Sequence, residues 1–146
     1  MVGLLEPVAG NVFINGDALW GDESNMTQVL REFGVLFQGG ALWSSMTIQE
    51  NVALPLEIHT DLIDSEIEDI VRYKLGLVGL SGFETYYPAQ LSGGMKKRAG
   101  LARALALDPK ILFFDEPLSS LDYRLRKTLE KELKQLHART GKTFVY

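Results

Sequence analysis

Two neighbouring carboxylates, Asp115 and Glu116, come directly after the apolar run Ile111–Phe114. An Asp in this place can hold Mg²⁺ through coordinated water, because Mg²⁺ is a hard cation that keeps several of its waters. A Glu beside it can act as the general base that polarises an attacking water. The pair therefore indicates metal-assisted hydrolysis. A solvated acidic turn after a strand is the alternative, and these two residues alone do not decide between them.

A Ser-Gly-Gly turn at Ser92–Gly94 is the second candidate site. Ser92 is a good N-cap, and the first turn of a helix leaves backbone N–H groups without intrahelical partners. Two glycines let a ligand approach that backbone closely. Such a turn suits a phosphate group, although an ordinary capped helix start has the same pattern. The helical face that follows carries Met95, Ala99, Ala102 and Ala106.

The elements that must position these groups follow from the apolar pattern. Ile111–Phe114 lies between Pro109 and Pro117 and suits a strand buried on both faces, as in a parallel sheet. Phe33–Phe37 also has the pattern of a buried strand, and Gln38–Gly40 ends it. Open α/β sheets bind ligands at the carboxyl ends of their strands, which is where the two carboxylates are expected.

Together these pieces resemble the nucleotide-binding subunit of ABC transporters. LSGGM is followed by KKR, then by ILFFDEP and SSLD, in that order. Leu91–Met95 matches the signature motif of that family, Ile111–Glu116 its Walker B strand with the catalytic Glu, and Ser119–Asp122 its D-loop. The resemblance extends over nearly the whole chain.

The resemblance implies ATP and Mg²⁺ as cofactors and gives each matching residue a role. Glu116 would be the catalytic base, and Gln38 would reach Mg²⁺ and the attacking water with its amide oxygen. Asp115 and Gln38 would hold the Mg²⁺ ion. A Gln after a strand is otherwise usually a solvated loop residue. The residues implied to bind ATP are Leu91, Ser92, Gly93, Gly94, Gln38 and Asp122.

The resemblance also implies the fold. The expected class is α/β: part of a P-loop NTPase core sheet of the ABC ATPase type, with a helical subdomain and a remnant of an antiparallel β element. Residues 1–146 are expected to form one incomplete ABC ATPase domain. Residues 1–40 would form the core and β remnant through the Q-loop, residues 41–95 the helical subdomain, and residues 96–146 the core part around the Walker B strand.

Two motifs of the family are missing from the sequence. The P-loop pattern G-x-x-x-x-G-K-[ST] occurs nowhere, and the switch His of the family would lie past the strand that starts at Thr143, since His137 falls within a helical pattern. The P-loop supplies the phosphate cradle and a Mg²⁺ ligand. We therefore expect a chain truncated at both ends, and we expect residues 1–146 by themselves to bind ATP weakly or not at all.

The composition is that of a soluble globular protein with one domain: 146 residues, of which 46% are hydrophobic and 23% charged. A net charge of −4 argues against a general affinity for nucleic acid. There are no cysteines, so no disulfide framework is expected. No apolar run approaches the ~20 residues that span a bilayer, and no signal peptide is visible. The expected location is the cytoplasmic face of the inner (plasma) membrane, reached through partners.

The resemblance implies two kinds of partner: a second ATPase subunit in a head-to-tail dimer, and transmembrane permease subunits. ATP would lie between the P-loop of one subunit and Ser92–Gly94 of the other, and Asp122 would link the two sites. The loop after Gln38 would contact the permease. Two alternatives stay open: a soluble ABC ATPase of DNA repair or translation, and a non-catalytic interaction module that only keeps the fold.

Two longer stretches resemble one branch of the family, the ATPases of Mla/Mce-type phospholipid transporters. They read GVLFQGGALWSSMTIQENVALPLEIHT and YPAQLSGGMKKRAGLARALALDP. Met95 and Lys96–Arg98 fit that branch better than the commoner signature ending in Gln. Ser119–Asp122, by contrast, resembles importers of sugars or amino acids. The resemblance as a whole predicts transport of lipid or phospholipid.

The remaining N-terminal segments have local patterns of their own. Asn11–Asn15 alternates and ends at an Asn-Gly turn, which predicts a short antiparallel strand. Asn25–Arg31 can form a short helix. A further helix is predicted over Ile48–Ala53, ending near Pro55.

Two more helices follow from spacing and capping signals. Ser65 with Glu68 predicts a capping box. The apolar positions of that helix are Ile63, Ile67, Ile70, Val71 and Leu75. The C-terminal helix is predicted to end at Gly141. The basic residues Lys96–Arg98 and Arg103 are predicted to lie on a solvated helix face.

Overall fold

The centre of the computed structural model is a parallel sheet of three strands in the order β3, β4, β5. The strands are β3 (Phe33–Leu36), β4 (Ile111–Phe114) and β5 (Thr143–Val145). Phe33 pairs with Ile111, and Leu112 with Phe144. The structure describes residues 6–14, 16–20, 26, 29, 31–115 and 123–145. The predicted α/β class with a parallel sheet is confirmed.

Strand β4 is fully buried on one face only. Leu112 and Phe114 are buried, whereas Ile111 and Phe113 on the opposite face are half-buried. The prediction that this strand is buried on both faces is therefore wrong for one face. The reason is that the helices pack on the Leu112 side, while on the other side the ring of Phe113 meets the edge of Phe33 at 5.5 Å between centroids.

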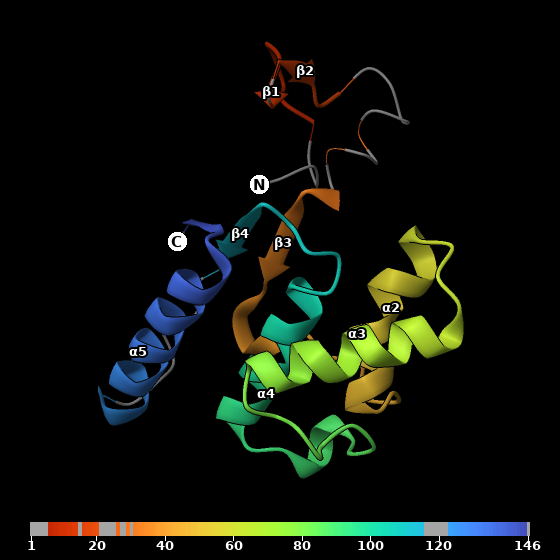
Figure 1. Ribbon diagram of the computed structural model, residues 1–146. Helices are drawn as coiled ribbons and strands as arrows, with labels where there is room; N and C mark the ends of the chain where they lie inside the picture. The colour runs from red at the N-terminus through yellow and green to blue at the C-terminus, as the bar shows by residue number, and fades with distance from the viewer. Residues whose placement is uncertain are drawn as a thin grey trace.

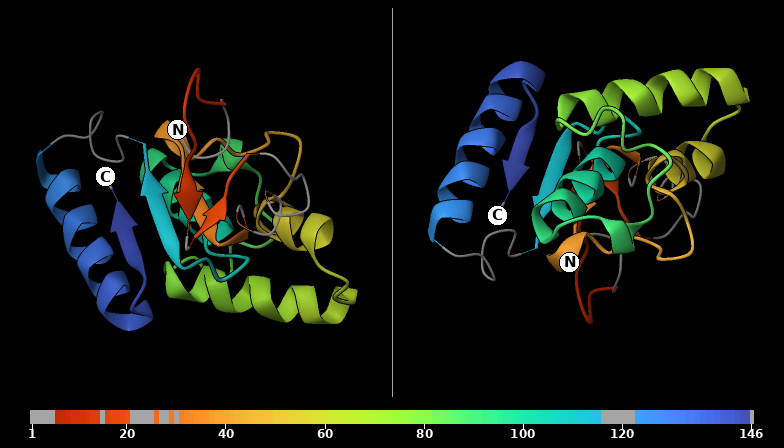
Figure 2. Two further views of the ribbon diagram at one scale, coloured as in Figure 1. Left: turned by 90° about the horizontal axis from the view of Figure 1, so that it is seen from above. Right: turned by 90° about the horizontal axis from the view of Figure 1, so that it is seen from below.

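Two helices cover the buried face of the sheet, α4 (Gly93–Ala104) and α5 (Tyr123–Thr140). Figure 2 shows both helices alongside the strands, with α5 next to β5. Burying one Leu side chain contributes about 1.5–3 kcal/mol, so this layer supplies much of the stability of the sheet. The core residues on the two helices include Ala99, Leu101, Ala102, Leu133 and Leu136.

Helices α2 (Ile48–His59) and α3 (Asp64–Leu77) form the rest of the helical part, beside α4 (Figure 1). A capping box starts α2. The hydroxyl of Thr47 accepts a hydrogen bond from the Glu50 amide at 3.2 Å, and the Glu50 carboxylate accepts one from the Thr47 amide at 2.6 Å. The Glu50 carboxylate also accepts a hydrogen bond from the Thr47 hydroxyl at 2.8 Å. The bonds that the carboxylate accepts, first from the Thr47 amide and then from the Thr47 hydroxyl, lower the pKa of the Glu50 carboxyl.

Helix α2 continues through Pro55, so the prediction that the helix ends there is wrong. A Pro inside a helix cannot donate to the carbonyl four residues earlier, here that of Asn51, and costs ~3 kcal/mol. Val52 and Leu56 are almost completely buried on the same helix. The burial of these side chains offsets the cost of the missing hydrogen bond.

Helix α3 begins at Asp64, so Ser65 and Glu68 lie inside it and the predicted capping box is wrong. Glu66 plays the capping role, because its carboxylate accepts a hydrogen bond from the Ile63 amide at 3.1 Å. Ile63 comes before the helix and is exposed, in contrast to its predicted place on the apolar face. The buried residues of that predicted face are Ile67, Val71 and Leu75.

A separate antiparallel pair lies near the N-terminus and consists of β1 (Phe13–Ile14) and β2 (Asp17–Ala18). Figure 1 shows this pair at the top, apart from the helices. The antiparallel strand predicted within Asn11–Asn15 is thus confirmed. Most of the predicted helix Asn25–Arg31 lies outside the described residues.

Helix α5 ends at Gly141, as predicted. Gly141 has φ +64°, and its amide donates to the carbonyl of His137 at 2.9 Å, which is a common way for a helix to end. His137 lies within the helix and its ring meets the edge of Phe144, 5.2 Å between centroids. In the part of the chain that the structure describes, no helix combines the length and the apolar character needed to cross a membrane.

Candidate functional site

Asp115 comes directly after β4, and Gln38 lies two residues after the end of β3, the adjacent parallel strand. The Asp115 amide donates to the carbonyl of Leu36 at 2.9 Å, which extends the pairing of the strands as far as the acidic residue. Both side chains are exposed. The structure thus brings the two residues predicted to hold Mg²⁺ to one edge of the sheet.

This pair of residues fits the chemistry of Mg²⁺ with a nucleotide. An amide oxygen and a carboxylate are hard donors, and Mg²⁺ usually takes only one or two protein carboxylates, with water and substrate phosphates as its other ligands. Within the described ranges, no group of three or more His, Cys, Asp or Glu side chains gathers into a larger metal site. Glu116 and Asp122, predicted as catalytic base and ATP contact, lie outside those ranges.

The short 3₁₀ turn η1 (Gln38–Gly40) is held against α4 by close backbone contact. Gly40 has φ +84°, and a Cβ there would come within 2.7 Å of the carbonyl oxygen of Lys96. A Cβ on Gly100 would come within 2.8 Å of the Gly40 Cα. Only glycine fits at both places, so the two glycines let α4 cross directly behind the turn that carries Gln38.

Arg103 also fixes this turn. Its guanidinium donates to the carbonyl of Ala41 at 2.8 Å and to that of Gly40 at 3.1 Å, and burial lowers its pKa. Lys97 is buried as well, which lowers the pKa of its amine. The prediction of a solvated basic face is therefore wrong for these two residues. They point inward because α4 packs against η1 and α2 along that side.

The Ser-Gly-Gly turn forms the start of α4, as predicted. The Ser92 hydroxyl accepts a hydrogen bond from the Met95 amide at 3.3 Å. The amides of Gly93 and Gly94 have no acceptor among the described residues, and a Cβ on Gly93 would meet nothing within 4 Å. Leu91, just before the turn, is buried. As far as the described residues show, the turn therefore presents two amides without an acceptor at a helix start, which suits an anion.

The start of α4 and the carboxyl ends of the strands face the same end of the molecule. In the right-hand view of Figure 2, the green amino end of α4 lies toward the arrowheads of β4 and β5. Helix α4 runs back from there toward the beginning of β4. The Ser92–Gly94 turn and the Asp115 edge are thus both placed to meet ligands from one side.

Asn51 is a structural residue of this region that the sequence reasoning missed. It is completely buried in α2. Its amide oxygen accepts from the Trp43 amide at 2.7 Å, and its amide nitrogen donates to the carbonyls of Trp43, Met46 and Thr47 at 2.9–3.2 Å. Asn51 thereby fixes residues 43–47, which follow the Gln38 turn. The sequence signal that could have indicated this role is a single polar residue, Asn51, among the apolar positions of a helix.

Comparison with known proteins identifies the family. Residues 1–119 match the family described as ABC transporter, which is most of the chain. The chain belongs to the ABC transporter family, as an ATP-binding domain. The resemblance stated from the signature motif and Walker B strand is therefore confirmed.

Curated relatives agree with this assignment. The chain is 51% identical over 123 residues to a probable ribonucleotide transport ATP-binding protein, mkl, of Mycobacterium tuberculosis, covering 84% of this chain and 34% of that protein. It is 43% identical to the glycine betaine transport ATP-binding protein OpuAA of Bacillus subtilis, covering 98% of this chain and 34% of that protein. The chain thus spans 34% of the length of both relatives.

Solved structures share the fold. The structure of cbiO1 from Clostridium perfringens, described as part of an ABC transporter complex, has a TM-score of 0.84 at 25% identity and covers 97% of this chain and 57% of that one. An ATP-binding cassette solved as a dimer in a post-hydrolysis state, bound to ADP and phosphate, has a TM-score of 0.81 at 32% identity. The match covers 98% of this chain and 64% of that one.

Proposed function

We propose that the protein is the ATP-binding and ATP-hydrolysing subunit of an ABC transporter. The observation that carries this proposal is the arrangement of Gln38 and Asp115 at one edge of the sheet, with the Ser92–Gly94 turn presented toward the same end of the molecule. Membership of the family supports it further.

In this proposal Glu116 is the general base, next to the Mg²⁺ ligand Asp115. The Glu116 carboxylate would take a proton from the water that attacks the γ-phosphorus, and the bond from that phosphorus to the oxygen of the leaving ADP would break. The Gln38 amide oxygen would orient the water and help to hold the metal. Bound Mg²⁺ offsets the negative charge on the phosphates. Leu91, directly before the signature turn, is buried in the core and so holds the turn in place.

The Ser92–Gly94 turn serves a second copy of the protein in this proposal. The free amides at the start of α4 contact the γ-phosphate of ATP that the opposite subunit holds, so the dimer is head-to-tail and ATP joins its halves. Asp122 would link the two sites across this interface. One of the structural relatives was solved as a dimer, which supports this arrangement.

The proposed membrane partner is a transmembrane permease that docks beside the Gln38 turn, at the cytoplasmic face of the inner membrane. Large apolar side chains are exposed on both sides of Gln38 in the chain, at Phe37 directly before it and at Trp43 five residues after it. Tyr86 and Tyr87 are exposed as well. Tyr86 lies at the start of α2, since its carbonyl accepts from the Ile48 amide at 2.8 Å. Exposed aromatic side chains of this kind are typical of protein interfaces.

The proposed cargo is lipid or phospholipid. The support is the likeness of the Gln38 and signature stretches to the ATPases of phospholipid transporters. The relatives named above are described as transporting ribonucleotide or glycine betaine, and other relatives as importing sulfate or thiosulfate. Reconstitution of the protein and its permease in vesicles with labelled phospholipid tests the cargo, and transport of a small solute alone would contradict it.

The experiment that tests the proposed activity is the Glu116→Gln substitution in an intact version of the subunit that includes a P-loop, because residues 1–146 by themselves are expected to bind ATP weakly and to be inactive. We expect ATP turnover to fall by about 10²–10⁴-fold, because the amide cannot accept the proton of water. Dimers that form with ATP should persist, since binding does not need the base. The measurements are phosphate release and size-exclusion chromatography with ATP.

The matched control is Glu68→Gln, an exposed carboxylate on α3, which should turn over ATP at the parental rate. Parental turnover by Glu116→Gln would refute the role of Glu116. Absence of turnover in the intact parent subunit, which includes a P-loop, would refute the ATPase proposal itself.

A further inference from the structure

A cavity of about 250 Å³ opens at the opposite end of the sheet from the candidate nucleotide edge. It lies beside Asp108, three residues before β4, and Lys142, directly before β5. Figure 2 shows the carboxyl ends of α3 and α5 side by side at this end, away from the arrowheads of β4 and β5. A four-residue strand spans about 13 Å, so the cavity is separate from the Asp115 edge.

The charged groups around this cavity are mostly positive. The Nζ atoms of Lys74 and Lys142 lie 3.2 and 3.0 Å from Oδ1 of Asp108. Arg139 lines the cavity too and makes no ion pair with any described residue. Three cations and one carboxylate leave a net charge of +2 around the cavity.

Lys74 has hydrogen-bonding capacity left over. Its side chain is only 8% exposed, against 75% for that of Asp108. An ammonium has three N–H donors, and among the described residues Lys74 gives one of them, to Asp108. The Tyr73 ring lies 5.8 Å from the ammonium and meets part of its charge. The rest is largely withdrawn from bulk water, which is costly unless an anion or water meets it.

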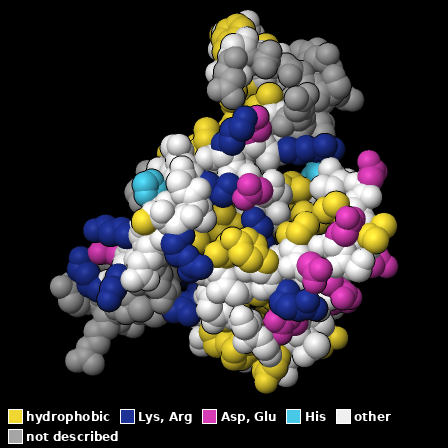
Figure 3. Space-filling model, viewed as in Figure 1, with side chains coloured by type: hydrophobic (Ala, Val, Ile, Leu, Met, Phe, Trp, Pro, Cys, Tyr) yellow, Lys and Arg dark blue, Asp and Glu magenta, His cyan; other side chains and the backbone are white. Residues whose placement is uncertain are grey.

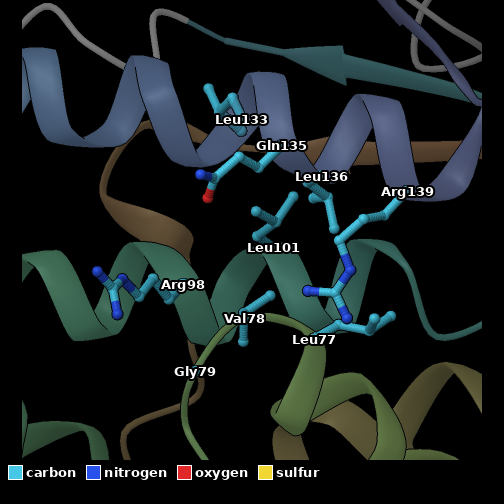
Figure 4. Close-up of a pocket in the computed structure, with 9 residues that line it drawn as sticks. All are labelled: Leu77, Val78, Gly79, Arg98, Leu101, Leu133, Gln135, Leu136 and Arg139. Atoms are coloured by element: carbon cyan, nitrogen blue, oxygen red, sulfur yellow. The ribbon is translucent and has the colours of Figure 1, made fainter.

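Arg139 lies where this cavity meets a second one of about 180 Å³, since it lines both together with Leu77. Figure 4 shows its side chain extending from α5 across the gap toward Leu77. The second cavity has an apolar floor that includes Leu101 and Leu136. Arg139 is thus placed to bind a ligand in the cavity that Lys74 and Lys142 also line.

The charge on the surrounding surface is also uneven. On the face seen in Figure 3, Asp and Glu side chains gather over the α2 and α3 side, while Lys and Arg side chains gather toward α5. An anion that approaches α5 therefore meets a favourable field.

We propose that this cavity binds a small oxyanion of the phosphate class, held by Lys74, Arg139 and Lys142. The planar guanidinium fork of Arg139 matches two oxygens of a tetrahedral anion, and the lysine ammonium groups meet the others. The anion would offset the net positive charge that remains around the cavity after the charge of Asp108 is counted. Free phosphate and the phosphate of a lipid headgroup share this chemistry.

The test is a titration of the whole protein with inorganic phosphate by calorimetry, at constant ionic strength. We expect saturable binding that the Arg139→Gln variant weakens by about tenfold or more, the loss of one charge-assisted contact. Arg139 is exposed, so this variant should fold. Lys142→Gln, which leaves Asp108 its contact with Lys74, should weaken binding similarly. The matched control is Lys134→Gln, an exposed cation on the same helix, which should bind as the parent does.

A second readout locates the anion. Crystals soaked in selenate should show an anomalous peak within reach of Arg139 and Lys74. Retention on phosphatidylcholine vesicles that contain phosphatidic acid, lost in Arg139→Gln, would identify a lipid headgroup as the source, whereas binding of free phosphate without retention would identify the soluble anion. Equal phosphate affinity of the parent and Arg139→Gln, or no saturable binding, would overturn the proposal. No outcome depends on ATP turnover.

Discussion

At the scale of single residues, the described part of the site depends on polar groups that bond to backbone atoms. Asn51 bonds to the backbone of residues 43–47, and Arg103 bonds to the carbonyls of Gly40 and Ala41. Neither side chain faces the proposed ligand. Both hold the chain around Gln38 in place, so that the amide oxygen of Gln38 stays at the sheet edge.

Replacing Asn51 with Ala is expected to lower the free energy of unfolding by about 2–3 kcal/mol. The change leaves the Trp43 amide and the carbonyls around it without their buried partner, and an unsatisfied buried group costs about 1–3 kcal/mol. Urea unfolding measures the effect. Glu57→Ala, an exposed change on the same helix, is the control and should stay within ~0.5 kcal/mol of the parent. Equal values for the two variants would contradict the role of Asn51.

At the scale of elements, the crossing of α4 behind η1 decides where the Gln38 turn lies. Gly40 and Gly100 meet at this crossing with no room for a side chain on either. The sequence shows both glycines but not their contact, because they are far apart in the chain. Only the packing of α4 on the sheet brings them together.

Replacing Gly100 with Ala should destabilise the fold by about 1–3 kcal/mol, because its Cβ would come within 2.8 Å of the Gly40 backbone, which cannot move easily. Gly76→Ala is the matched control. It lies in α3, where a Cβ would make only an ordinary contact with Ser81 at 3.5 Å, and it should stabilise by about 0.4–1 kcal/mol. Thermal unfolding of both variants gives the comparison. A stabilised Gly100→Ala variant would show that the crossing is not tight.

Asp108 joins three elements: α3 through Lys74, the start of β4, and the start of β5 through Lys142. The hydrogen bond from Lys142, more than that from Lys74, lowers the pKa of the Asp108 carboxyl. A lowered pKa in the folded state means that the ionised carboxylate stabilises the fold above its ordinary pKa of 3.8, and that this contribution is lost as the pH falls through the folded value.

Asp108→Asn should therefore be less stable than the parent at pH 7, and the difference should disappear as the pH falls from 3.8 through the lower pKa of the folded carboxyl. Solvent screening of the exposed carboxylate limits the difference to ~1 kcal/mol. Asn tolerates the positive φ of +55° at this position as well as Asp does, so backbone strain does not enter. Urea unfolding at several pH values measures the difference in stability between the variant and the parent. Asp69→Asn, in the exposed pair with Arg72, should show almost no difference at any pH. A pH-independent deficit for Asp108→Asn would contradict the ion-pair argument.

At the scale of the whole molecule, the exposed aromatic residues near Gln38 are where a partner is expected. The double substitution Trp43→Ala and Tyr87→Ala should abolish copurification with the permease subunits, because each removes a large exposed side chain from the proposed contact. ATP-dependent dimers should still form. Tyr73→Ala, an exposed aromatic on α3, is the control. Copurification with ribosomes or DNA in place of membrane subunits would favour a soluble ABC ATPase instead.

Local patterns predicted much of the fold. The apolar runs around Phe33 and Ile111 marked two of the strands, the Ser92 turn marked the start of α4, and Gly141 marked the end of α5. Errors arose where two local signals competed. Pro55 favours a helix end, but burial of its neighbours outweighs the missing hydrogen bond. The Ser-x-x-Glu pattern predicts a cap at Ser65, two residues after the observed N-cap position, Ile63.

The sequence by itself determined the family, the order of the motifs, and that Asp115 follows a buried strand, because these depend on residue types and spacing along the chain. The tertiary structure decided that Asp115 lies beside Gln38, that Arg103 and Lys97 point inward, and that Lys74, Arg139 and Lys142 surround one cavity. These placements depend on which faces of helices and strands meet. Contacts between residues distant in the chain leave no local pattern, so packing alone fixes them.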